Sequence, residues 1–357
     1  MKNKSTKILV IALFLVILIA GTVLAIKIYN NKNNEDEETV VLGSEEGIAN
    51  APKEKEIKIY NGNDRPIAVM IDNHSGAWPQ GGLNDAYMVY EIIVEGGETR
   101  LMALVKGADV SKIGPIRSAR HYFLDYAMEN DAIYVHYGWS PQAESDITRY
   151  SINNINGISE SSTSFWRTKD KSSPHNVATS TEQILKIAER KKYRTTSTAK
   201  SVLNYTADEI SLGTSADETN TSSALTAVNV TIPHSNLQTV EYKYDSENKV
   251  YKRYARKKAQ TEWTTGAAIT AQNIIIEFID NSDLNDGENK GRQTLNNIGT
   301  FDGYYITNGK AIKIKCTKTA RDEKTVYKDL NGNEIKVNDG NTWVNICPKD
   351  ANVKITE

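Results

Sequence analysis

The stretch YMVYEIIVEGGETRLMALV, residues 87–105, contains two strand-like runs on either side of a Gly-Gly pair. The runs 87–94 and 99–105 are rich in β-branched, aromatic and other apolar residues, which favour the extended backbone of a strand. Gly96 and Gly97 adopt positive φ without steric cost, as short hairpin turns require. This stretch therefore predicts an antiparallel β-hairpin.

The segments around this hairpin combine strand and helix patterns. A short apolar run after Pro66 predicts a buried strand at 67–71, and a second strand is predicted at 132–137. We therefore predict a mixed α/β module over residues 57–193. Apolar residues at helical spacing predict its helices at 118–130, from Ser140 to about Tyr150, and at 181–192.

The second half of the chain has a different pattern. Residues 194–224 are dominated by Ser, Thr, Ala, Asn and Asp, and this change of composition predicts a polar linker. Short β-rich runs separated by turn residues follow, and they predict a mostly antiparallel, β-rich module over 225–357. The predicted fold class is therefore α+β. The predicted strands of the second module are 228–232, 240–244, 250–254, 274–279, 304–306, 311–316, 326–328, 334–337 and 342–346.

The composition of the 357 residues is ordinary for a globular protein. Hydrophobic residues make up 39% and charged residues 25%, which excludes collagen-like, coiled-coil and wholly disordered chains. Residues 1–29 hold four lysines and no acidic residue, so the net charge of −2 combines a basic start with an acidic remainder. An acidic body lacks the basic surface that nucleic acid requires, and we expect no nucleic-acid partner.

The sequence contains two cysteines, Cys316 and Cys347. Two cysteines exclude a disulfide-dense scaffold and a zinc site built from four cysteines. In an oxidising exterior the pair forms a disulfide, or else both are buried as small apolar side chains, and the sequence leaves both alternatives open.

An apolar segment near the N-terminus predicts where the protein resides. Residues 8–26, ILVIALFLVILIAGTVLAI, carry no charge, and helical residues in this number span about 28 Å, close to the hydrocarbon thickness of a bilayer. Three lysines precede the segment and an acidic cluster, residues 35–38, follows it, so the positive-inside rule places the N-terminus in the cytoplasm and the bulk of the chain outside. We predict a single-pass transmembrane anchor over 1–29 and a disordered tether over 30–56.

A cleaved signal peptide is the alternative to a retained anchor. Val23-Leu24-Ala25 has the small-residue spacing that signal peptidase accepts. No cysteine lies in or just after the apolar segment, which excludes a lipid-modified cysteine there. In either case we expect the body of the protein to be extracellular and close to the cell membrane.

Several long, irregular motifs stand out from this background of strands and helices. They are RPIAVMIDNH (65–74), PQGGLNDA (79–86), VYEIIVEGGETR (89–100), IGPIRSARHYF (113–123), DAIYVHYGWSPQA (131–143), FWR (165–167) and PHN (174–176). With them the chain resembles the DUF3048 (YerB-like) family of exported, membrane-anchored or lipoprotein-type proteins of Gram-positive bacteria. The resemblance covers Arg65 to the C-terminus and implies the same two modules, but no activity. Trp139 departs from the small residue expected at its position.

Asp72 and His74 directly follow the predicted strand 67–71. If the strand continues, these side chains share one face of the sheet. A carboxylate and an imidazole in that arrangement form an acid/base pair or two metal ligands. The alternative is an Asx turn at Asp72 with His74 on the surface.

Three arginines, Arg100, Arg117 and Arg120, predict an anion site. Arg117 and Arg120 flank the predicted start of a helix, where free N–H groups and the positive end of the dipole favour a carboxylate or phosphate. Guanidinium groups bind both anions in two-pronged fashion. Glu95, or Glu91 before it, is expected to face these arginines. The alternative is that the arginines only brace the acidic loop through ion pairs.

His136 and His175 are the other histidine candidates. His136 lies within a predicted strand, a position typical of a hydrogen-bonded structural residue, whereas His175 lies in a polar loop. Trp166 in the preceding motif either stacks on a sugar ring or packs in the core.

These residues predict a polar cleft in the first module. The leading hypothesis is a membrane-anchored extracellular protein that binds an anionic envelope ligand, a peptidoglycan or glycopolymer fragment. The first alternative is a wall-active hydrolase or transferase with His/Asp acid–base chemistry, with or without a metal. The second is a scaffold that binds an envelope protein partner through the β-rich module.

The candidate residues follow from these hypotheses. The catalytic candidates are Asp72, His136 and His175. The ligand-binding candidates are Glu95, Arg100, Arg117, Arg120, Trp166, Arg167 and Asn176. No cofactor is predicted, and the ligands for a metal, if one is used, are Asp72, His74, His136 and His175.

Overall fold

The computed structural model describes residues 55–213 and 224–357. The predicted transmembrane anchor lies outside the described residues, as do most of the predicted tether and residues 214–223 of the predicted linker. Within the described ranges, no helix is long and apolar enough to cross a membrane.

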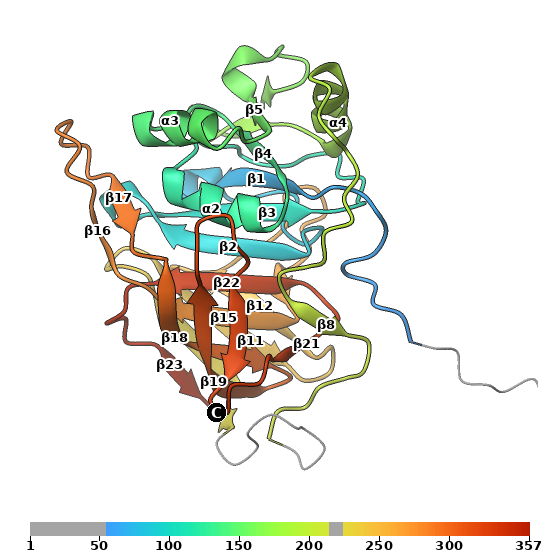
Figure 1. The fold of residues 1–357 in the computed structure, drawn as a ribbon, viewed down its shortest axis with the longest axis vertical. Helices are drawn as coiled ribbons and strands as arrows, with labels where there is room; N and C mark the ends of the chain where they lie inside the picture. Colours follow the sequence, from blue (N-terminus) through green and yellow to red (C-terminus); the bar gives the residue numbers. More distant parts are fainter. Residues whose placement is uncertain (1–54, 214–223) are drawn as a thin grey trace, which may run out of the picture. The chain divides into compact units, whose positions relative to one another are not determined.

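The largest element of the fold is a sheet of eleven strands (Figure 1). Its order is β20-β19-β18-β15-β22-β2-β3-β1-β4-β5, and β9 pairs with β19. In chain order the strands are β1 (Ile67–Asp72), β2 (Met88–Ile93), β3 (Thr99–Val105), β4 (Ile133–His136), β5 (Asn154–Asn156), β9 (Leu225–Thr226), β15 (Asn273–Phe278), β18 (Gly299–Thr307), β19 (Lys310–Lys318), β20 (Val326–Asp329) and β22 (Thr342–Cys347).

A second sheet of six strands has the order β13-β12-β11-β10-β23, with β14 beside β12. Its strands are β10 (Asn229–Pro233), β11 (Thr239–Asp245), β12 (Val250–Ala255), β13 (Lys258–Ala259), β14 (Thr270–Ala271) and β23 (Lys354–Thr356). Three two-stranded sheets complete the β structure. They are β6 (Trp166–Arg167) with β7 (Val177–Ala178), β8 (Asn204–Thr206) with β21 (Lys336–Asn338), and β16 (Asn281–Asp283) with β17 (Gln293–Leu295).

The predicted hairpin is confirmed and lies in the middle of the large sheet. β2 and β3 pair antiparallel, from Met88 opposite Leu104 to Ile93 opposite Thr99. Residues Glu95–Gly97 form the short 3-10 turn η2, in which Gly96 has a φ of 68°. A side chain at that φ would be strained, which is the physical reason for glycine at the tip.

The two predicted modules share this sheet. β2 from the first module pairs in parallel with β22, which lies near the end of the chain, and β15 pairs in parallel with the other edge of β22. The division into 57–193 and 225–357 therefore does not separate two independent sheets. The predicted linker 194–224 also contains an ordered strand, β8.

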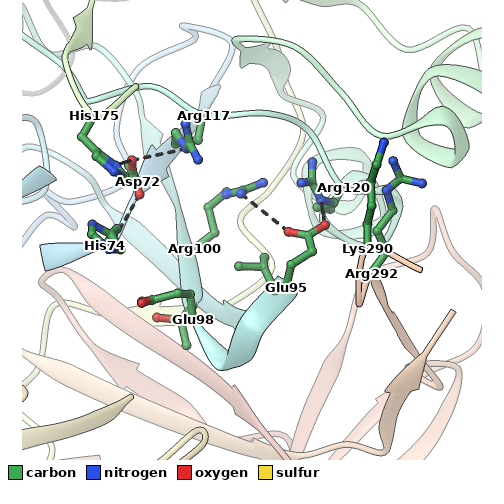
Figure 2. Close-up of a pocket in the computed structure, with 12 residues that line it drawn as sticks. Asp72, His74, Glu95, Glu98, Arg100, Arg117, Arg120, His175, Lys290 and Arg292 are labelled. Carbon is green, nitrogen blue, oxygen red and sulfur yellow. Dashed lines mark hydrogen bonds and ion pairs between the residues drawn. The ribbon is translucent and has the colours of Figure 1, made fainter. Parts of the chain in front are cut away.

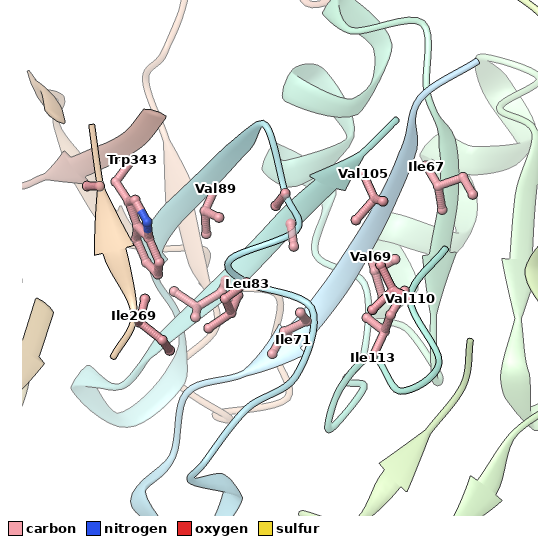
Figure 3. Packing of buried hydrophobic residues seen from close by; sticks show 14 of the residues in the cluster. Ile67, Val69, Ile71, Leu83, Val89, Val105, Val110, Ile113, Ile269 and Trp343 are labelled. Carbon is pink, nitrogen blue, oxygen red and sulfur yellow. The ribbon is translucent and has the colours of Figure 1, made fainter. Parts of the chain in front are cut away.

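The central strands β1, β2, β3 and β22 are buried on both faces of the large sheet, which explains why they are apolar without alternation. In β1, Val69 and Ile71 belong to one core, whereas Ala68 and Met70 belong to the other. The first core packs against the second sheet and helix α4 (Thr181–Arg190), and Figure 3 shows Trp343 of β22 in this layer. The second core packs against α2 (His121–Glu129) and α3 (Pro141–Arg149).

The predicted helices form, with one shifted boundary. Ser140 caps α3 by accepting a hydrogen bond from the N–H of Ala143, as a serine at an N-cap does. The helix predicted at 118–130 begins only at His121. The residues before it are held in an extended conformation, because the N–H of Ala119 donates to the carbonyl of Gly138 at 2.9 Å.

Neither cysteine forms a disulfide. Cys316 on β19 and Cys347 on β22 are free and buried. Burial raises the pKa of the Cys347 thiol to about 12, so this side chain stays protonated at physiological pH. The second of the two sequence alternatives, two buried apolar side chains, therefore describes both cysteines.

A buried carboxyl group predicts how stability depends on pH. Glu277 on β15 is 2% exposed and accepts a hydrogen bond from the hydroxyl of Tyr327 at 2.8 Å. Burial raises the pKa of Glu277 from 4.5 to about 7. The folded state thus holds this proton more tightly than the unfolded state, so the contribution of Glu277 to stability is greatest below pH 4.5 and falls as the pH rises towards 7.

Glu277→Gln is therefore expected to stabilise the protein at pH 8 by on the order of 2 kcal/mol. The gain should vanish below about pH 4, where wild-type Glu277 is protonated in both states. Urea unfolding at several pH values measures it, with Glu334→Gln at an exposed position as the matched control. Equal stability of Glu277→Gln and wild type at pH 8 would contradict the raised pKa of Glu277.

Candidate functional site

A polar pocket of about 340 Å³ lies where β1 ends and β3 begins (Figure 2). It is lined by five cationic side chains, three carboxylates and two histidines. The sequence predicted six of these residues as members of one cleft, and the structure brings those six together. The lining residues are Asp72, His74, Val94, Glu95, Glu98, Thr99, Arg100, Arg117, Arg120, His175, Lys290 and Arg292.

Asp72 is the central carboxylate of the pocket. It is the last residue of β1, is only 4% exposed, and lies opposite Arg100 in the register of β1 and β3. Its Oδ1 accepts a hydrogen bond from the N–H of His74 at 3.0 Å. Its Oδ2 lies 2.7 Å from Nδ1 of His175 and 3.3 Å from Nε of Arg117. The Asx turn, the second of the two alternatives for Asp72 and His74, is therefore present. The imidazole that contacts the Asp72 carboxylate is that of His175 and not that of His74.

The two histidines stack on each other, with ring centroids 4.4 Å apart and planes 12° apart. Nδ1 of His74 accepts a hydrogen bond from the N–H of Gly76, so the neutral ring carries its proton on Nε2. Nδ1 of His175 faces a carboxylate and is therefore the donor. This leaves Nε2 of a neutral His175 as a free proton acceptor, which is the tautomer of a general base.

The arginines form a second group beside this pair. Nη1 of Arg100 donates to the carbonyl of Ser118 at 2.6 Å, and its Nη2 lies 3.9 Å from Glu95. Burial lowers the pKa of Arg100 to about 10, with further lowering by the positive charges of Arg120 and Arg117. The structure thus concentrates more positive charge here than the neighbouring carboxylates balance.

Glu95 holds part of this positive charge in place. Its carboxylate accepts a hydrogen bond from Nε of Arg120, whose Nη1 also donates to the carbonyl of Ala119 at 2.7 Å. Burial alone would raise the pKa of Glu95, but the hydrogen bond and charge of Arg120, together with Arg100, lower it. Glu95 is therefore ionised at neutral pH and positions the arginines, as the bracing alternative required.

Sequence reasoning missed four polar members of the pocket: Glu98, Thr99, Lys290 and Arg292. Glu98 and Thr99 lie within four residues of Glu95 in the same hairpin. Their position in the sequence therefore indicated that they would lie near the predicted cleft. Lys290 and Arg292 lie on the segment between β16 and β17, and no local pattern relates that segment to the hairpin. Both cations pair with Glu288, at 2.7 and 2.9 Å.

His136 is not part of the pocket, which corrects the predicted cleft. It is buried on β4, where its Nδ1 lies 2.8 Å from the carbonyl of Gly138 and its Nε2 lies 3.1 Å from Oδ1 of Asn154. The neutral ring donates its one N–H from Nδ1 to the carbonyl of Gly138, and its Nε2 faces the side-chain amide of Asn154 inside the protein. Burial lowers the pKa of His136, so it stays neutral and serves neither as catalytic base nor as metal ligand in this arrangement.

The predicted ligand-binding residues Trp166, Arg167 and Asn176 also lie outside the pocket lining. Nη1 of Arg167 donates to Oδ1 of Asn176 at 2.7 Å, and Asn176 donates in turn to the carbonyl of Thr168 at 3.1 Å. These bonds fix the loop that carries His175, so Arg167 and Asn176 support the pocket from outside its lining. Among the described residues, no group of three metal-ligating side chains is arranged to hold a metal ion.

A buried polar layer lies behind the pocket, between the two large sheets. Glu91 on β2 is fully buried and accepts hydrogen bonds from Asn73 at 3.0 Å and from Thr99 at 2.8 Å. Its other oxygen accepts from Nη2 of Arg253 on β12 at 2.7 Å. Burial alone would raise the pKa of Glu91, but Arg253 and His234 lower it. This ion pair connects the second sheet to the strand ends that carry the pocket.

The fold and the pocket define a class: a two-sheet α/β protein with an Asp–His pair and an arginine cluster at the ends of its central strands. The chain belongs to the DUF3048 family, as its sequence motifs indicated. The model described as "Protein of unknown function (DUF3048) N-terminal domain" matches residues 53–194, and that of the DUF3048 C-terminal domain matches residues 213–344.

Two comparisons with individual proteins agree with this assignment. The Bacillus subtilis (strain 168) protein named "Putative lipoprotein YerB" is 32% identical over 292 residues, which cover 80% of this chain and 81% of that protein. The crystal structure of the YerB protein from Bacillus subtilis has a TM-score of 0.70 at 29% identity, covering 82% of this chain and 94% of that one.

Proposed function

We propose that this protein is held at the outer face of the cell membrane and binds an anionic envelope ligand, a peptidoglycan or glycopolymer fragment, in the pocket around Asp72 and Arg117. The name of its relative supports a membrane-associated, extracellular location. Residues 8–26 would supply the anchor in this proposal, because they are uncharged, apolar and long enough to cross a bilayer as a helix.

The excess of cationic groups in the pocket carries the binding proposal. Lys290 and Arg292 are paired with Asp286 and Glu288, which lie outside the pocket lining. The three arginines Arg100, Arg117 and Arg120 have two carboxylates, those of Asp72 and Glu95, within ion-pair distance, and Arg100 is only 5% exposed. Buried guanidinium groups need anionic partners, since an unpaired buried charge is costly. A carboxylate or phosphate in the pocket would supply the missing negative charge and would accept two-pronged hydrogen bonds from an arginine.

Arg117→Ala/Arg120→Ala is expected to weaken anion binding at least tenfold, because each lost charge-assisted hydrogen bond contributes about 1.5–3 kcal/mol. The measurement is calorimetric titration of the full-length protein in detergent, with glycerol phosphate and N-acetylmuramic acid as probes. Lys313→Ala/Lys336→Ala removes the same charge from exposed strand positions and is the matched control. Equal affinities of wild type and the arginine double variant would overturn the proposal.

A second candidate function is acid–base catalysis on the same ligand, as a hydrolase or transferase. The observation that favours it is the 2.7 Å contact between Asp72 and Nδ1 of His175, which leaves Nε2 to take a proton. The neighbouring arginines would then stabilise negative charge that develops in the transition state.

A further inference from the structure

A second pocket, of about 280 Å³, is built around the exposed indole of Trp139. Trp139 is 37% exposed, which is unusual for the largest side chain in a segment whose neighbours are mostly buried. The sequence pointed to Trp166 as the aromatic residue for a sugar, whereas the structure exposes Trp139. The polar side chains that line this pocket are Glu144, Thr148, Asn154, Asn156, Ser159 and Lys191.

The Trp139 ring is held in place from behind. Its centroid lies 5.5 Å from that of His136, whose ring lies between the carbonyl of Gly138 and the side-chain amide of Asn154. The backbone on both sides of Trp139 is bonded to Ala119: Ala119 donates to the carbonyl of Gly138 at 2.9 Å and accepts from the N–H of Ser140 at 3.2 Å. The indole is therefore a preorganised flat surface, which lowers the entropic cost of binding.

The polar side chains around the indole supply hydrogen-bond donors and acceptors that suit the hydroxyl groups of a sugar. Oδ1 of Asn156 is committed to the N–H groups of Gly138 and Ile158, which leaves the NH₂ group of Asn156 for a ligand. The exposed Glu144 and Ser159 add a carboxylate acceptor and a hydroxyl. An apolar aromatic surface surrounded by amide, carboxylate and hydroxyl groups matches a sugar ring, which has apolar C–H faces and a polar hydroxyl edge.

We propose that the Trp139 pocket is a carbohydrate-binding site that takes a neutral pyranose ring stacked on the indole. This goes beyond the proposed anion binding, because it concerns a different pocket and an uncharged group. The two pockets are connected through the backbone, since the stretch that carries Arg117 and Arg120 pairs with residues 137–140, which carry Trp139.

The test uses full-length protein with indole ¹⁵N labels and N-acetylglucosamine tetramer as the neutral probe. The sequence has five tryptophans. The Trp139 signal, assigned from its loss in Trp139→Phe, is expected to shift on titration while the other four stay in place. Trp139→Ala is expected to lower the affinity at least about tenfold, whereas Trp139→Phe keeps the stacking surface and stays within about threefold.

Two further variants make the result decisive. Glu144→Ala, on the exposed surface of α3, is expected to weaken binding about fivefold through the lost hydrogen bond. Arg117→Ala/Arg120→Ala is expected to leave the affinity for the tetramer within twofold of wild type. The two proposals are therefore tested independently, because the arginine variant tests anion binding and the Trp139 variants test sugar binding. An unchanged affinity in Trp139→Ala, or a shift confined to other tryptophans, would overturn the proposal.

Discussion

Replacing Arg253 by Met is expected to lower the free energy of unfolding by about 3–5 kcal/mol, because it leaves the carboxylate of Glu91 buried without its cation. Both side chains of this pair are fully buried, and Arg253 also packs over Trp343, with its guanidinium carbon 4.6 Å from the ring centroid. Met fills most of the volume of the arginine stem, so the loss reflects the charge more than a cavity.

The effect of Arg253→Met should depend on pH. In the wild type the pKa of Glu91 is lowered, so its ion pair stabilises the fold at neutral pH, and this contribution is lost as the pH falls through the folded-state pKa. In the variant, burial instead favours protonated Glu91. The deficit relative to wild type is therefore expected to be largest near pH 8 and to shrink towards pH 4, as measured by urea unfolding.

The double variant Glu91→Gln/Arg253→Met is the control for this experiment. Its glutamine keeps a carbonyl oxygen for the donors of Asn73 and Thr99 and carries no charge. We expect it to recover most of the lost stability, to within about 1–2 kcal/mol of wild type. A double variant as unstable as Arg253→Met would show that lost packing, and not the uncompensated charge, causes the effect.

Replacing Asp72 by Asn is expected to separate binding from catalysis in the Asp–His pocket. The amide nitrogen of Asn can donate to Nδ1 of His175, which moves the ring proton to Nε2 and removes the base. If the pocket performs acid–base chemistry, turnover should fall at least 100-fold. Affinity for an anion should be kept or increased, because the pocket loses one of its three carboxylates.

Two measurements on the same preparation check this expectation. Release of reducing ends and amino groups from isolated cell walls reports turnover, and calorimetric titration with glycerol phosphate reports binding. Asp302→Asn is the matched control, because Asp302 is an exposed carboxylate paired with Lys315. Turnover that is retained in Asp72→Asn would rule out the acid–base role, and a large loss of anion affinity would contradict the charge argument for binding.

The elements that depend on short-range patterns were predictable. The hairpin formed as expected, because apolar side chains and a glycine turn act within about twenty residues of one another. The same holds for the helix capped by Ser140. Asp72, Glu95 and the arginines were found as candidates because polar residues at strand ends and helix starts interrupt an otherwise apolar pattern.

The error at His136 has the same origin. An imidazole within a strand carries the same sequence signal whether it faces a cleft or a hydrogen-bond partner inside the protein. Asn154 and Gly138 decide between these two cases, and only the pairing of β4 with β5 brings Asn154 to the ring. The histidine that does contact Asp72 lies about a hundred residues further along the chain.

The sequence by itself determined the family, the run of strands and helices, and most of the polar residues around the pocket. Only the tertiary structure decided which strands are neighbours. The pairing of β2 with β22 therefore joins both predicted modules in one sheet, which no local pattern indicated. The tertiary structure also decided the burial of Glu91 against Arg253, the arrival of Lys290 and Arg292 at the pocket, and the exposure of Trp139. The physical reason is that secondary structure follows from local side-chain periodicity, whereas strand order and ion pairing follow from burying apolar faces that lie far apart in the chain.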